Sequence, residues 1–90
     1  MHAVVVKVNI HDFDVAREGL VTQVVPRVSQ APGFVAGYWT RSEGGDGGLG
    51  MVVFESEDAA RAVADMIQSQ GPDEGVTLEG VEVREVVAHA

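Results

Sequence analysis

Cysteine is absent from this 90-residue sequence. Disulfides, zinc–thiolate sites, iron–sulfur clusters and cysteine nucleophiles are therefore excluded, because each of them needs a sulfur ligand or thiol. Histidine occurs at positions 2, 11 and 89. His2 and His89 fall near the ends of strands expected to pair, but no third fixed ligand accompanies them. We expect neither a metal nor a cofactor.

Basic residues are scarce. Six of them stand against fourteen acidic residues, giving a net charge of −8. The basic residues are spread singly along the chain as Lys7, Arg17, Arg27, Arg41, Arg61 and Arg84. Without a basic stripe there is little to attract nucleic acid or anionic lipid, so we expect neither as a partner. We interpret the acidity as favouring solubility.

Long hydrophobic runs are also missing. Hydrophobic residues make up 46% of the chain, yet no window approaches the roughly 20 apolar residues that cross a bilayer. The first residues do not resemble an export signal, so we expect a cytoplasmic protein. The length predicts a single domain over 1–90, small enough that burial against a partner chain would add stability.

The first half of the chain reads as strand, helix and strand. Residues 3–10 are β-branched and alternate, which predicts a strand. Asp12 or Asp14 is the expected cap of a helix. Pro26 should kink or break this helix, because proline has no backbone N–H to donate to the carbonyl of Thr22. The helix has apolar residues at Leu20, Val21, Val24, Val25 and Val28. Pro32-Gly33 ends this helix, and residues 34–41 form the second strand.

The second half reads as strand, helix and strand. Residues 42–48, SEGGDGG, are interpreted as a flexible hairpin loop, because a phosphate-binding loop would continue into GKS or GKT and a helix. A third strand spans 49–55. Ser56 with Glu57 and Asp58 starts a helix that ends at Gly71-Pro72. A polar loop over 71–75 then leads to a last strand within 76–88, best defined over 81–87.

The element order predicts an α+β protein with a ferredoxin-like βαββαβ fold. Right-handed crossovers favour a four-stranded antiparallel sheet in the order 4-1-3-2, with both helices on one face. The apolar side of each strand should meet the helices. We expect this helix-facing set to be Val4, Val6, Val8, Leu49, Met51, Val53, Val81, Val83 and Val87.

The opposite face of the sheet is too apolar for open water. It is expected to carry Val5, Lys7, Asn9, Gly50, Val52, Phe54, Glu82, Arg84 and Val86. In the second strand either Tyr38 or Trp39 belongs to this face, and we expect Trp39. We therefore predict that two copies pack these faces together as a homodimer around a small-molecule cavity. Its candidate lining residues are Lys7, Asn9, Trp39, Val52, Phe54 and Arg84.

Two segments, APGFVAGYWTRS (31–42) and MVVFESEDAARAVAD (51–65), resemble the dimeric α+β barrel superfamily, in particular antibiotic-biosynthesis monooxygenases. The resemblance covers nearly the whole chain. It implies, for quinone-forming members, an Asn and a Trp four residues apart on the third strand, where this chain has Gly50 and Phe54. Haem-degrading members are expected to carry a Trp and a His on or after the second helix. That helix here contains neither residue, so haem degradation is not expected.

Two functional hypotheses follow. The first is a non-catalytic homodimer that binds a small ligand, such as an aromatic molecule, or serves as a scaffold. The second is a cofactor-independent monooxygenase acting on an aromatic or polyketide-like substrate, with Asn9 and Trp39 as hydrogen-bond donors and Arg84 holding an anion. The missing donors at Gly50 and Phe54 favour the first. Whether Trp39 and Tyr38 serve packing or ligand contact stays open from the sequence.

Overall fold

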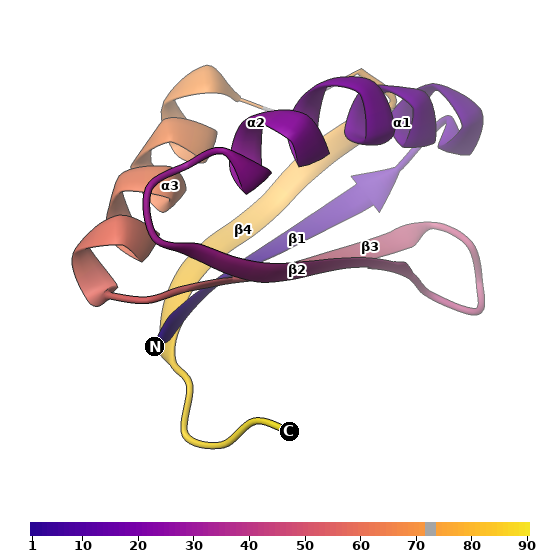
Figure 1. Ribbon diagram of the computed structural model, residues 1–90. Coiled ribbons are helices and arrows are strands. Elements are labelled where there is room, and N and C mark those ends of the chain that lie inside the picture. The colour runs from indigo at the N-terminus through magenta and orange to yellow at the C-terminus, as the bar shows by residue number, and fades with distance from the viewer. Residues whose placement is uncertain (72–73) are drawn as a thin grey trace.

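The computed structural model describes residues 1–71 and 74–90. Figure 1 shows four strands forming one sheet, with all helical segments on one side of it. The predicted loop over 71–75 includes Pro72 and Asp73, which lie outside the described residues. The elements are β1 (His2–Ile10), α1 (Phe13–Gly19), η1 (Leu20–Val24), α2 (Val25–Ser29), β2 (Phe34–Arg41), β3 (Gly47–Phe54), α3 (Glu57–Gln70) and β4 (Val76–Glu85).

The sheet has the order β2-β3-β1-β4, and every neighbouring pair is antiparallel. This confirms the predicted α+β architecture, because the same order read from the other edge is 4-1-3-2. The arrangement is compatible with a ferredoxin-like domain. Among the residues described, no helix has both the length and the apolar character needed to cross a membrane.

The first helical run covers α1, η1 and α2 and contains a wide π-helical turn. Asp12 caps its start by accepting a hydrogen bond from the backbone N–H of Val15 at 3.3 Å. In η1 the N–H of Val25 reaches back five residues to the carbonyl of Leu20, whereas an α-helix reaches back four. Pro26 follows this turn at the start of α2. The regular α-helical pattern is thus interrupted beside the proline that was expected to disturb it.

The helix α3 packs against the sheet through its apolar stripe. The hydroxyl oxygen of Ser56 accepts a hydrogen bond from the N–H of Ala59 at 3.1 Å, which confirms Ser56 as the cap. The core joins this helix to α2 and the sheet, and its buried residues are Val4, Val28, Val52, Phe54, Ala60, Val63 and Ala64. Phe54 is 0% exposed, and its ring meets that of Phe34 edge-on at 6.2 Å between centroids.

The prediction for the faces of β3 is wrong. Val52 and Phe54 are buried beneath the helices, whereas Leu49 and Met51 are exposed on the opposite face, by 44% and 42%. The cause is space: a β-carbon on Gly48 would stand 2.6 Å from Cγ2 of Val8. Glycines are therefore required beneath large side chains of neighbouring strands, and counting hydrophobic residues strand by strand does not detect that requirement.

The end of the last strand also differs from the prediction. β4 ends at Glu85, and Val87 beyond it is 88% exposed instead of facing the helices. The backbone N–H of Val86 still donates to the carbonyl of Met1 at 3.0 Å. After this bond the chain leaves the sheet.

Candidate ligand-binding site

The structure divides the six candidate site residues between the two faces of the sheet. Trp39, Val52 and Phe54 lie on the face covered by the helices, where they belong to or pack against the core. The three polar candidates lie on the other face. Each of them either alternates along its strand with residues that face the core, or is paired with a residue of β1 that alternates in this way. These three are Lys7, Asn9 and Arg84. The expectation that Trp39 faces away from the helices is wrong, and Tyr38 takes that face, 69% exposed.

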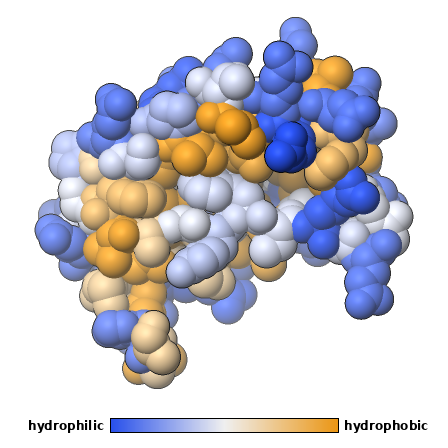
Figure 2. All heavy atoms as spheres, turned by 45° about the vertical axis from the view of Figure 1, so that its right-hand side comes forward, coloured by the Kyte–Doolittle hydropathy of each residue, from blue (hydrophilic) through white to orange (hydrophobic). Residues whose placement is uncertain are grey.

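A pocket of about 450 Å³ lies between the helices and the sheet. It occupies the end of the molecule where β1 finishes and the β2–β3 hairpin turns, at the right of Figure 1. Figure 2 brings this side forward and shows hydrophobic residues exposed between hydrophilic ones along the edges. The volume falls within the range of about 300–1,000 Å³ that is usual for small-molecule sites.

The walls of the pocket are mainly apolar. Val6, Val8 and Val52 contribute from the sheet, because their side chains alternate onto the helical face of β1 and β3. Met66 and Ile67 contribute from the last turns of α3. Phe13 and Val21 lie at the outer side of the pocket and are 38% and 56% exposed. Such a surface is suited to the apolar part of a ligand.

Trp39 forms the aromatic part of the pocket wall. Its ring lies over two glycines, and a β-carbon built on Gly37 would stand 2.7 Å from the ring atom Cη2. On the adjacent strand, a β-carbon on Gly50 would stand 2.9 Å from Cδ1 and 3.1 Å from Nε1. Trp39 is half-buried and packs against the core while also lining the pocket. Of the two roles that the sequence left open, packing is therefore observed, and contact with a ligand stays a prediction.

The wide turn η1 shapes the helical side of the pocket. Leu20, Val21 and Val24, three of its five residues, line the cavity. An α-helix repeats every 3.6 residues, and a π-helical turn widens that repeat and turns the following side chains. Such turns are often found at functional sites. The widened turn thus lies against the cavity, on the helical wall opposite the sheet.

Three arginine side chains are among the polar groups of the pocket. The guanidinium carbon of Arg41 lies 3.7 Å from the centre of the Phe13 ring, a cation–π contact. Arg27 donates from Nη1 to Oε1 of Gln70 at 2.8 Å. Arg17 also lines the cavity. Among the described lining residues none is serine, cysteine, histidine or tyrosine. The side chains there that belong to the usual nucleophiles and general bases are Thr40 and Glu74.

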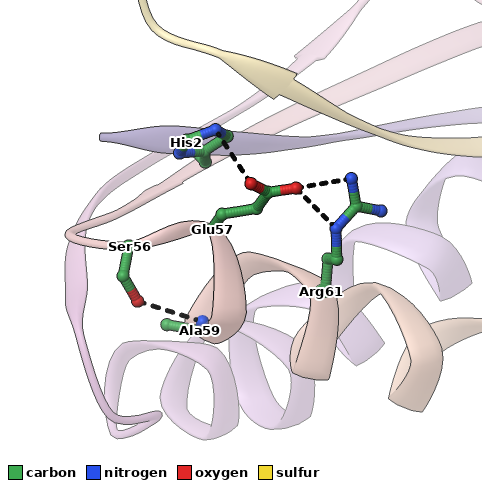
Figure 3. A network of polar contacts seen from close by, with 5 residues as sticks. All are labelled: His2, Ser56, Glu57, Ala59 and Arg61. Atoms are coloured by element: carbon green, nitrogen blue, oxygen red, sulfur yellow. Dashed lines mark hydrogen bonds and ion pairs between the residues drawn. The ribbon is translucent and has the colours of Figure 1, made fainter.

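A separate polar cluster stands at the start of α3 (Figure 3). Glu57 accepts from Nη2 of Arg61 at 2.6 Å, and its other oxygen lies 3.8 Å from Nε2 of His2. The hydrogen bond and charge of Arg61, followed by the charge of His2, lower the pKa of Glu57. His2 begins β1, whereas the pocket is lined by the later part of that strand. Over residues 1–71 and 74–90, no group of three or more acidic or histidine side chains is arranged to hold a metal.

Sequence reasoning missed the arginines of the pocket, because Arg17, Arg27 and Arg41 are far apart in the chain. One signal was available: Arg17 follows Phe13 by four residues, which places both on one helix face. The position of Arg41 depends on the contact of β2 with Phe13 of α1, which no local pattern specifies. Comparison with known proteins adds no relative, since no protein-family model matches this chain and no curated protein matches it.

Proposed function

We propose that this protein binds a small, largely apolar molecule in the pocket between its helices and its sheet. The observation that carries the proposal is the cavity itself, with about 450 Å³ of space beside the Trp39 ring. Well-packed cores leave few voids larger than a water molecule. A hollow of this size with a mixed apolar and arginine lining is typical of a binding site.

Binding without catalysis is favoured by the chemistry of the lining. The face of β3 that looks into the pocket presents Gly48, Gly50 and Val52, and none of these side chains donates a hydrogen bond. The hydroxyl of Thr40 already donates to the carbonyl of Leu49 at 2.9 Å. The described part of β3 therefore supplies no side-chain donor to stabilise charge that develops in a reaction.

The proposal includes a homodimer formed through the face of the sheet that the helices leave bare. Tyr38, Leu49 and Met51 project from this face, and each is more than 40% exposed. Tyr38 and Met51 are directly paired across β2 and β3, so their side chains form one continuous apolar surface. A second copy offers the same surface, which makes a twofold interface self-complementary.

The binding proposal is tested with the uncharged fluorescent dye N-phenyl-1-naphthylamine. We expect saturable binding of one dye per chain, with energy transfer from Trp39, the single tryptophan of the sequence. Val24→Phe replaces a valine of the pocket wall with a larger, aromatic side chain. It should weaken dye binding at least about tenfold, the effect of losing about 1.4 kcal/mol of binding free energy. Val87→Phe is the matched control, because Val87 is almost fully exposed and outside the pocket. Dye binding that is absent, or unchanged by Val24→Phe in a folded protein, overturns the proposal.

A second candidate is a cofactor-independent monooxygenase. One observation favours it: the indole nitrogen of Trp39 lies 3.1 Å from the point where a side chain at position 50 would begin. An N–H donor thus stands where β3 itself supplies none. In such a reaction a phenol and O₂ would give a quinone and water, with the phenol supplying the electrons.

Oxygen uptake with a panel of phenols tests this candidate. Turnover above the protein-free rate that Trp39→Phe lowers at least about tenfold would support it, since one hydrogen-bond donor to a developing oxyanion contributes about that much or more. Asn9→Ala is the matched control, because Asn9 lies on the other face of the sheet. Uptake that needs Asn9 but not Trp39 would place any reaction outside the pocket.

A further inference from the structure

Positive charge is concentrated at the pocket. Three of the six basic residues of the chain line it, namely Arg17, Arg27 and Arg41. Among the described lining residues, Glu74 is the one acidic side chain, although the chain has fourteen acidic residues. The local charge of the pocket is thus opposite in sign to the net charge of −8.

The pocket arginines also differ from the other two arginines in their partners. Arg61 and Arg84 each pair with a carboxylate, Glu57 at 2.6 Å and Glu82 at 2.9 Å. Within residues 1–71 and 74–90, no carboxylate lies within 4.0 Å of the guanidinium group of a pocket arginine. Arg41 stacks on an aromatic ring, and Arg27 donates to an amide oxygen. Their capacity to bind a carboxylate is therefore not used by the described part of the chain.

Two of these arginines belong to the same side of the pocket. Arg41 lies on the ring of Phe13, and Arg17 stands one helical turn after Phe13 on α1. Residues four apart on a helix are neighbours on its surface, so Arg17 and Arg41 flank Phe13 from the helix and from the strand. Arg27 lies toward α3, where it bonds Gln70. The apolar wall formed by Trp39 and Val52 continues inward from this arginine pair.

We infer that the ligand of this pocket is a carboxylic acid with an apolar body. The carboxylate lies at Arg17 and Arg41, and the apolar body extends along Trp39 toward Met66 and Ile67. Guanidinium groups match carboxylates in geometry and can bond them through two parallel hydrogen bonds. Because the protein as a whole is acidic, its overall field does not attract anions, and the local arginines supply the selectivity. This inference rests on the proposed binding function.

The test compares two competitors that differ in charge but share an apolar chain. Decanoate and 1-decanol are used to displace N-phenyl-1-naphthylamine at about pH 7.5, where a carboxylic acid is ionised. We expect decanoate to displace the dye at a concentration at least about tenfold lower, the size expected of one charge-assisted hydrogen bond. The double variant Arg17→Gln/Arg41→Gln should remove this advantage and leave displacement by 1-decanol unchanged. Arg61→Gln is the matched control and should keep the advantage, because Arg61 is outside this pocket.

Each outcome bears on a different step. Equal displacement by both competitors, or an advantage of decanoate that persists in the double variant, overturns the carboxylate inference and leaves pocket binding standing. Failure of the wild-type protein to bind the dye, or of both competitors to displace it, overturns pocket binding and the inference with it. A cooperative urea-unfolding transition of the double variant shows that it has kept its fold.

Discussion

The indole ring of Trp39 lies over Gly50 of the neighbouring strand, so closely that a β-carbon on this glycine would stand 2.9 Å from Cδ1 of the ring. The two residues are directly paired in the β2–β3 ladder. Gly37, two residues before Trp39, provides the same space on β2 itself. The inward position of Trp39, and with it the aromatic wall of the pocket, depends on these two glycines.

Gly50→Ala should therefore destabilise the protein by about 1–3 kcal/mol, the usual cost of overpacking. The free energy of unfolding is measured by urea denaturation. Gly80→Ala is the control, because no atom lies within 4 Å of a β-carbon at that position. In a Trp39→Ala background the cost of Gly50→Ala should largely disappear. Equal costs in the two backgrounds would show that the ring does not fill this space.

Phe54→Ala should cost about 3–5 kcal/mol of unfolding free energy, because it removes a fully buried ring that meets Phe34 edge-on. Tyr38→Ala, at a residue 69% exposed in one copy, should change the unfolding of a single chain by about 0.5 kcal/mol or less. Denaturation at protein concentrations low enough to avoid association measures both. A larger loss for Tyr38→Ala than for Phe54→Ala would contradict the assignment of the two faces.

Much of the fold could be predicted from the sequence, because its elements have strong local signals. β2 spans the predicted residues 34–41, and Ser56 caps α3 as expected. The order of the strands followed from the handedness of crossovers. These features depend on the alternation of residues along a strand, on helix-capping residues and on the order in which the chain connects its elements. All three can be read from a single sequence.

Which side of β3 meets the helices, and which residues make up the site, could not be predicted in the same way. Leu49 and Met51 are more hydrophobic than Gly48 and Gly50, yet the glycines face the helices. Which side is inward depends on how much room Val8 and Trp39 occupy, a property of neighbouring strands. The arginines of the pocket likewise come from three separate elements, and only the tertiary packing brings them to one cavity.

Met51→Lys should dissociate the proposed homodimer, because it places a charge in the centre of the bare face. Sedimentation equilibrium at micromolar concentration should give twice 9.5 kDa for the wild-type chain and 9.5 kDa for this variant. Val15→Lys introduces the same charge on an exposed residue of α1 and should leave the dimer intact. A wild-type mass of 9.5 kDa would refute the dimer.

Arg61→Gln should raise the pKa of Glu57 toward its ordinary value, because Arg61 is the main cause that lowers it. His2→Gln should raise the pKa less, since the charge of His2 is the weakest of the lowering causes. A pKa lowered in the folded state stabilises the protein above the unfolded pKa, and this contribution is lost as the pH falls through the folded pKa. NMR titration of the Glu57 carboxyl carbon measures the shift. A larger effect of His2→Gln would contradict the order of these two causes.

The most direct test of the proposed site is the position of a bound ligand relative to Trp39. The sequence contains one tryptophan, so the indole N–H gives one signal in a ¹⁵N–¹H NMR spectrum. On saturation with decanoate we predict that this signal moves, while the amide signals of Lys7 and Asn9 on the other face of the sheet stay in place. Movement of the Lys7 and Asn9 signals with the indole signal unchanged would contradict a binding site between the helices and the sheet.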